Sequence, residues 1–159
     1  MKTIILNRNK STLVDDGDFL SLSQWKWRCD PQYGYAIRTK YLGKGLDGKK
    51  KTTIVRMHRE IIKPENGKEV DHINGDRLDN RRSNLRPATR QENSRNKLPN
   101  PGKFTKGICW REGRNKWQTS ISVNNKSVYL GLFSEKHVAL EAYDNAAKKY
   151  FGEFARLNF

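Results

Sequence analysis

The chain has 159 residues, which is enough for one ordinary domain or two small ones. Its 32 Lys and Arg against 17 Asp and Glu give a net charge of +15, which favours polyanionic partners. No apolar run approaches the ~20 residues that a membrane span needs, and the first apolar stretch is too short for a signal peptide.

The cysteine content points to a reducing compartment. Cys29 and Cys109 stand alone, without the paired spacing of a zinc site or a disulfide framework. We therefore expect a cytoplasmic protein with no membrane partner. Only 35% of the residues are hydrophobic, so the expected core is thin, and a bound ligand or metal can add to its stability.

Residues 1–50 are predicted to form short strands joined by turns. Turn signals occur at Asp15-Asp16-Gly17 and at Asp30-Pro31. Residues of strand-forming type alternate in part between them, at Trp25, Trp27, Tyr33, Tyr35 and Ile37. We interpret this stretch as a β scaffold with a basic face, and no catalytic pattern is visible in it.

The following segment predicts a strand at 49–56, a helix at 57–63, strands at 69–73 and 84–88, and a helix from Thr89 to about Lys97. The first helix ends before Pro64. Asn74-Gly75 is a tight-turn signal between the last two strands, and Thr89 to Glu92 matches a capping box. The order after residue 68 is strand, loop, strand, helix.

The chemistry of this segment centres on Asp71-His72. Phosphodiester hydrolysis needs a base for water, a metal for the developing charge, and a group that aligns both. Asp71 is a hard oxygen ligand that suits Mg²⁺ or Mn²⁺, and the Asn93 carbonyl could be a second one. Asn84 can bridge loop backbone groups. Taken alone, however, an Asp-His pair is more often a structural feature of a turn.

The two other histidines have weaker patterns around them. His58 could touch a substrate or pack and cap locally, and we favour the packing interpretation. His137 falls in a later predicted helix, where we expect it at the surface.

The spacing of four residues within 58–97 is specific. Asn84 follows Asp71-His72 by twelve residues, and Asn93 follows nine residues later. The run MHREIIKPENGKEVDHINGDRLDNRRSNLRPATRQENSRNK resembles the HNH endonuclease family, in its phage and mobile-intron homing branch.

This resemblance implies a ββα-metal site with a role for each residue. His72 would be the general base for water, and Asn84 would constrain the loop that orients it. Asp71 and Asn93 would bind one divalent metal together with the scissile phosphate. The third position is Asn, and Lys97 stands where some members carry another histidine ligand, which favours Mg²⁺ or Mn²⁺ over zinc.

Arginines are dense around the same segment. They are expected to contact the phosphates of double-stranded DNA, the alternative being a solvated surface. These residues are Arg77, Arg81, Arg82, Arg86, Arg90 and Arg95.

The stretch KLPNPGK, with two prolines and a glycine, predicts a domain boundary. We predict a nuclease module at 1–98, a linker at 99–105 and a second module at 106–159. In the second module, alternation predicts two strands around an Asn124-Asn125 turn, with Val128, Leu130 and Leu132 on the apolar face. Ser134 is expected to cap a helix that runs to about Tyr150.

Residues 106–159 are similar to the AP2 DNA-binding domain. The matches are Gly107, Trp117, Leu130-Gly131, Phe133, Ala142-Tyr143-Asp144, Ala146-Ala147, Gly152 and Leu157-Asn158-Phe159. The resemblance implies a three-stranded antiparallel sheet plus a helix, with DNA read by the outer sheet face. Asp144 and Asn158 are expected to hold backbone instead of bases.

The residues of that expected outer face are Lys106, Arg111, Arg114, Lys116, Gln118, Ser120, Ser122, Ser127 and Tyr129. Several base-reading arginines of plant members are serines here, so plant target sequences are not transferred. Each lost Arg–guanine contact would give up about 1–3 kcal/mol of discrimination.

The sequence thus predicts an α+β protein: a β-rich module carrying a ββα-metal (HNH) motif, followed by an AP2-like module. The predicted function is a homing-type endonuclease that nicks double-stranded DNA as a monomer, with a dimer left open. Two alternatives remain at this point, a DNA-binding regulator with an inactive nuclease site and an RNA-binding protein. Binding should weaken steeply with salt.

Overall fold

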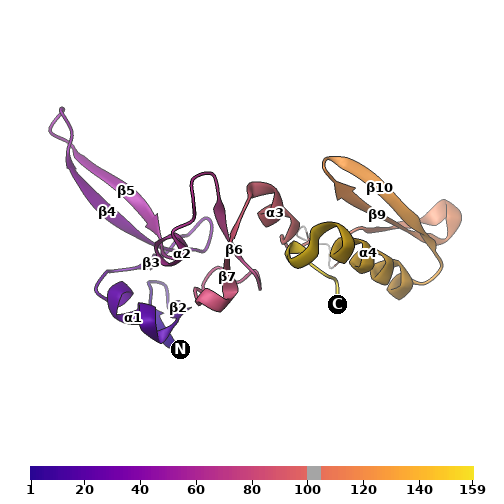
Figure 1. The fold of residues 1–159 in the computed structure, drawn as a ribbon, viewed down its shortest axis with the longest axis horizontal. Helices are drawn as coiled ribbons and strands as arrows, with labels where there is room; N and C mark the ends of the chain where they lie inside the picture. Colours follow the sequence, from indigo (N-terminus) through magenta and orange to yellow (C-terminus); the bar gives the residue numbers. More distant parts are fainter. Residues whose placement is uncertain (100–104) are drawn as a thin grey trace. The chain divides into compact units, whose positions relative to one another are not determined.

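The computed structural model describes residues 1–99 and 105–159, which form two compact units, Met1–Arg90 and Gln91–Phe159 (Figure 1). The described part combines helices with several small sheets, so the predicted mixed α and β composition is confirmed. Residues 100–104 of the predicted linker lie outside the described residues, and the module limits 1–98 and 106–159 stay predictions. None of the described helices has the length and apolar character needed to cross a membrane.

The first unit contains three antiparallel sheets, ordered β1-β2, β3-β4-β5 and β6-β7. The strands are β1 Lys2–Ile5, β2 Ser11–Val14, β3 Arg28–Cys29, β4 Ala36–Lys44, β5 Lys50–Arg56, β6 Glu69–His72 and β7 Leu85–Ala88. The helices are α1 Asp16–Ser23, α2 Met57–Ile62 and the short 3₁₀ turn η1 Arg82–Asn84. The predicted strand at 49–56, helix at 57–63 and strand pair at 69–73 and 84–88 are therefore confirmed, with small changes of bounds.

One hydrophobic core joins these elements. It is built from Ile4, Leu6, Val14, Leu22, Trp27, Cys29, Ala36, Met57, Ile61, Val70 and Leu85. The N-terminal hairpin thereby packs with α2 and with the β6–β7 hairpin. In addition, the backbone of Leu13 in β2 accepts from the N–H of Asn80 and donates to the carbonyl of Leu78, both at 2.9 Å. The N-terminal scaffold therefore holds the loop that follows β6.

The prediction of a turn at Asp15-Asp16-Gly17 was wrong, because α1 begins there. The helix buries Leu22, and Phe19 packs on the core, so burial outweighs the local turn preference. Asp18 in its first turn also suits the positive end of the helix dipole.

The aromatic alternation between Trp25 and Ile37 was misleading as well. Of the residues in that pattern, only Ile37 lies in a strand. The indole of Trp27 is buried and donates to the carbonyl of Leu22 at 2.8 Å. The turn at Asp30-Pro31 is confirmed, since the Asp30 carboxylate accepts from the N–H of Gln32 at 2.9 Å.

The second unit has one three-stranded antiparallel sheet, ordered β10-β9-β8. Its strands are β8 Ile108–Arg111, β9 Lys116–Val123 and β10 Lys126–Phe133, and its helices are α4 Lys136–Phe151 and most of α3 Arg90–Arg95, with 3₁₀ turns η2 Glu112–Arg114 and η3 Gly152–Phe154. One sheet face packs on α4 through Ile121, Tyr143, Ala146, Ala147 and Phe151. Gly107 lies at φ +75°, and a Cβ there would come within 1.9 Å of the Tyr143 ring.

Two details of this unit differ from the prediction. The strand pairing shifts at a bulge between Tyr129 and Gly131, so Leu132 lies opposite Gln118, on the outer face. The expected apolar alternation therefore ends at Leu130. The helix begins after Glu135, which occupies the N-cap position without a side-chain cap bond, so Ser134 is not the cap.

Candidate functional site

The β6–β7 hairpin positions the predicted site residues. Its register pairs Asp71 with Arg86 and His72 with Leu85. Successive side chains of a strand point to opposite faces, so the carboxylate and the imidazole have different neighbours. Both are buried, with 4% and 5% of their surface exposed.

Asn84 closes the loop between the two strands. Its Oδ1 accepts from the backbone N–H of Asn74 at 3.0 Å, and its Nδ2 donates to the carbonyl of Asp79 at 2.8 Å. Its own carbonyl accepts from the N–H of Ile73 at 2.9 Å. The expected bridge between loop backbone groups is thus observed.

Further side chains make the loop rigid. Nδ2 of Asn74 donates to Asp79 at 2.9 Å, and Oδ1 of Asn74 accepts from the N–H of Asp76 at 2.8 Å. Arg81 forms a fork with the Asp79 carboxylate, with bonds of 2.7 and 2.6 Å. The hydrogen bonds from Arg81 outweigh the opposing effect of burial and hold the pKa of the Asp79 carboxyl below its usual value.

A chain of polar groups orients His72. The Thr12 hydroxyl donates to the carbonyl of Leu78 at 2.6 Å and accepts from Nδ2 of Asn80 at 2.8 Å. This sets the Asn80 amide with its oxygen toward Nε2 of His72, at 3.4 Å. An amide oxygen only accepts, so Nε2 carries the ring proton and the basic lone pair falls on Nδ1.

Burial keeps this imidazole neutral. It lowers the pKa of His72, and the hydrogen bond to Asn80 and the charge of Asp71 oppose this only in part. A histidine whose pKa lies below its usual value is unprotonated at neutral pH. Such a ring can accept a proton.

His58 lies beside His72. The two rings are 5.1 Å apart in an edge-to-face arrangement, and the Tyr35 ring lies 4.8 Å from His58. Burial, followed by the neighbouring His72 and Arg56, lowers the pKa of His58 to about 3. Its Nδ1 has no hydrogen-bond partner within the described residues. His58 therefore packs against the site, and neither Tyr35 nor His58 could have been assigned to it from local spacing.

The Asp71 carboxylate is paired with Arg86. Nε and Nη2 of Arg86 donate to Oδ2 of Asp71 at 2.9 and 2.8 Å, and both side chains are largely buried. The structure thus places Arg86 beside the predicted metal ligand, where it fixes the orientation of the carboxylate. The sequence-based interpretation had placed it only on a DNA-facing surface.

The other predicted arginines have varied partners. Arg82 forks onto Asp18, and Arg77 donates to the carbonyl of Tyr33 at 2.6 Å. Arg90 is exposed. Asn93 and Arg95 lie in α3 within the second unit. The structure therefore brings Asp71, His72 and Asn84 together in the first unit, and the metal role of Asn93 stays a prediction.

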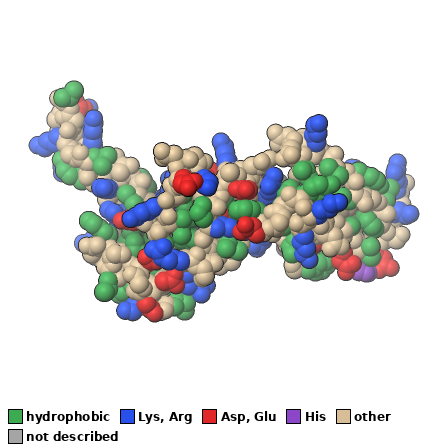
Figure 2. Space-filling view, viewed as in Figure 1, with side chains coloured by type: hydrophobic (Ala, Val, Ile, Leu, Met, Phe, Trp, Pro, Cys, Tyr) green, Lys and Arg blue, Asp and Glu red, His purple; other side chains and the backbone are tan. Residues whose placement is uncertain are grey.

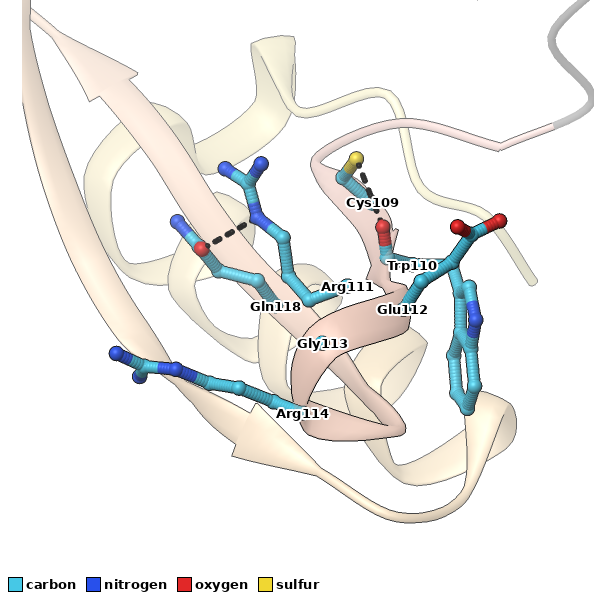
Figure 3. A pocket seen from close by; sticks show the side chains of 7 residues that line it. All are labelled: Cys109, Trp110, Arg111, Glu112, Gly113, Arg114 and Gln118. Carbon is cyan, nitrogen blue, oxygen red and sulfur yellow. Dashed lines mark hydrogen bonds between the residues drawn. The ribbon is translucent and has the colours of Figure 1, made fainter.

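The outer sheet face of the second unit carries most of the residues predicted for it. Cross-strand pairs put Arg111 with Lys116, Ser120 with Tyr129, and Ser122 with Ser127 on one face. Nε of Arg111 donates to Oε1 of Gln118 at 2.8 Å, beside an open pocket that Arg114 also lines (Figure 3). In that view Arg111, Arg114 and Gln118 extend away from Trp110.

Lys106 is a correction to the predicted outer face. Its ammonium donates to the carbonyls of Arg95 and Lys97, at 2.8 and 2.9 Å, at the end of α3. Burial lowers its pKa. Asp144 and Asn158 behave as expected, because the Asp144 carboxylate accepts from the backbone N–H of Asn158 at 2.9 Å and Asn158 accepts from the N–H of Lys106 at 2.7 Å.

Comparisons with known proteins give two kinds of similarity. The family model described as HNH endonuclease matches residues 57–95. An uncharacterised HNH endonuclease of Acanthamoeba polyphaga mimivirus is 32% identical over 161 aligned residues, covering 97% of this chain and 79% of the relative.

Shorter matches reach plant proteins. An AP2-like ethylene-responsive transcription factor of Arabidopsis thaliana is 41% identical over 46 residues, or 29% of this chain and 15% of that protein. APETALA2-like protein 2 of Oryza sativa subsp. indica is 39% identical over 54 residues, or 34% of this chain and 12% of that protein.

Proposed function

Because the chain belongs to the HNH endonuclease family, we propose that it is a homing-type, metal-dependent endonuclease that hydrolyses a phosphodiester of double-stranded DNA with a histidine-activated water. The family implies nuclease activity on DNA. The observation that carries the finer proposal is the state of His72, which is buried, neutral, and oriented through Asn80 and Thr12.

His72 acts as the general base. Its Nδ1 takes a proton from a water molecule while the water oxygen bonds to phosphorus and the bond from phosphorus to the leaving deoxyribose oxygen breaks. The leaving oxygen then takes a proton from solvent. Asn80 holds the ring in the tautomer that leaves Nδ1 basic, and Asn84 holds the loop that carries Asn80.

Asp71 and Asn93 are proposed to hold one Mg²⁺ or Mn²⁺. Carboxylate and carboxamide oxygens are hard donors of the kind these ions prefer. The Arg86 fork holds the Asp71 carboxylate in one orientation, which fits a ligand that must be pre-positioned. When bound, the ion supplies neutralisation of the charge that develops on the phosphate.

The second unit is proposed to hold the DNA through the outer face of its sheet. The similarity to plant AP2-like transcription factors supports this, as do the clustered side chains of Arg111, Arg114 and Gln118. A β-sheet can enter the major groove, where arginine and glutamine read base edges. We propose that this module, at 106–159, directs cleavage by the module at 1–98.

One ββα-metal site acts on one strand, so we propose that a monomer nicks its target. The test is to incubate the protein with phage or bacterial genomic DNA and Mg²⁺, and to sequence the ends that form. Nicks clustered on one strand at a defined sequence are expected. Matched breaks on both strands would contradict the monomer, and binding without any new ends would favour a DNA-binding regulator.

A further inference from the structure

The β4–β5 hairpin extends beyond the core of the first unit. Ala36, Ile37 and Arg38 at its base are buried, but from Thr39 outward β4 is largely exposed, as is β5 up to Ile54. Figure 1 shows this ribbon reaching away from α2 and β3. An isolated two-stranded ribbon is only marginally stable in water. Packing against the core does not account for the exposed part of this hairpin, whereas a binding role would.

The hairpin is well formed along that length. Its strands pair from Ile37↔Arg56 to Lys44↔Lys50, with a bulge between Tyr41 and Gly43. The end is closed by a bond of 2.8 Å from the Gly45 N–H to the carbonyl of Lys49. A bulge increases the twist of a ribbon, so the outer half is a twisted, double-stranded rod.

Its charge pattern is unfavourable without a partner. Residues 39–54 contain five lysines and one acidic residue, Asp47. Lys44 and Lys50 are directly opposite each other, and like charges in that position destabilise a sheet. Asp47 lies 3.9 Å from Lys49, in a pair that is well exposed on both sides. An external polyanion would relieve the repulsion.

Apolar side chains are interspersed with the lysines. Tyr41, Leu42, Leu46 and Ile54 are all exposed, Leu46 completely so. Figure 2 shows Lys and Arg side chains along the projecting hairpin with apolar ones among them. The register places Tyr41 on the same face as Lys44 and Lys50, so a ligand on that face would meet charge and an aromatic ring together.

We propose that the outer half of the β4–β5 hairpin, residues 39–54, binds in the major groove of duplex DNA, with Lys44 and Lys50 on phosphates. The major groove is about 12 Å wide and admits a two-stranded ribbon. The phosphates along its edges carry the negative charge that can pair with the lysines. This rests on the proposed function in one respect, that duplex DNA is the partner. It adds a contact surface at residues 39–54, most of which belongs to the stretch 1–50, where the sequence shows no catalytic pattern.

The experiment compares two charge-matched double variants of the full chain. Lys44→Gln/Lys50→Gln removes the proposed contacts, and Lys148→Gln/Lys149→Gln removes two exposed lysines from the end of α4. Binding to a mixed-sequence DNA duplex is measured from low to high salt, with structured RNA as a second ligand. Each phosphate contact adds about 0.9 to the steepness with which the logarithm of the binding constant falls with the logarithm of the salt concentration. This slope should therefore be less steep by about 1.8 in the hairpin variant and unchanged in the α4 variant.

A duplex whose cytosines carry a bulky group at C5 tests the groove, since that position projects into the major groove. The bulky group should weaken wild-type binding more than binding by the hairpin variant. An unchanged salt slope in the hairpin variant, or a loss confined to RNA, would overturn the proposal, and equal weakening by the bulky group would overturn the groove assignment. Cleavage is scored separately: a wild type that binds but never cuts refutes the endonuclease and leaves the hairpin result standing.

Discussion

The packing of His58 leads to a quantitative prediction about pH. The pKa of His58 lies near 3 in the folded protein, against 6.5 for the free side chain, because burial disfavours the charged ring. Between these two values the unfolded chain binds a proton that the folded chain does not, so stability falls as pH falls. Each pH unit in this window removes about 1.4 kcal/mol, and lowering the pH from about 7.5 to about 5 should therefore cost about 2 kcal/mol through His58.

The variant His58→Phe keeps a ring between Tyr35 and His72 but cannot titrate. Over the same pH change, the free energy of unfolding of this variant should therefore decrease by about 2 kcal/mol less than that of the wild type. The protein is equilibrated at increasing urea concentrations at each of the two pH values, and each sample is then given a deuterium pulse at one common pH. Deuterium uptake by peptides around Met57 and Val70 reports the unfolding of the first unit alone. His137→Gln is the control, because His137 is exposed. An equal loss in the wild type and in His58→Phe would refute the reasoning.

Three further predictions concern bonds seen in the structure. Asn84→Ala removes two side-chain bonds of the loop and leaves buried groups unpaired, so unfolding of the first unit should become easier by about 2–3 kcal/mol in a urea titration. Thr12→Val removes the hydroxyl that orients the Asn80 amide, so the cleavage rate at saturating DNA and Mg²⁺ should fall. The Kd for DNA should stay within about twofold of the wild-type value, which corresponds to a change in binding free energy of less than about 0.5 kcal/mol. Gly107→Ala would push a Cβ into the Tyr143 ring, so the Tm of the second unit should drop, and an unchanged Tm would show that the packing there is looser than described.

Local patterns in the sequence predicted much of the frame of the site. The strand, loop, strand, helix order around Asp71 followed from alternation, a tight turn and a capping box, because each depends on neighbouring residues. The bridging role of Asn84 followed for the same reason, since an amide at a strand start has loop backbone within reach.

The polar chain behind His72 could not be found in this way. Asn80 and Thr12 are 68 residues apart, and they meet because β2 runs beside the loop after β6. The Arg86 contact with Asp71 was in principle accessible from the hairpin register, where the two are direct partners. The sequence-based interpretation assigned Arg86 by charge alone and missed it.

Tertiary burial explains why the helix α1 forms over a turn signal, since Leu22 is buried there. The competing local preference is worth about 1 kcal/mol per residue or less, which the burial of one large apolar side chain exceeds. The position of Leu132 has another cause: a bulge near Leu130 breaks the alternation and places Leu132 on the outer sheet face.

The most direct test of the proposed chemistry is the rate of supercoiled plasmid nicking with Mg²⁺ by the wild type, His72→Ala and the matched surface variant His137→Ala. Wild type and His137→Ala should nick at the same rate. His72→Ala should be at least about 100-fold slower, since general-base catalysis contributes about 10²–10⁴. Nicking by a folded His72→Ala protein at the wild-type rate would contradict the assignment of His72 as the base.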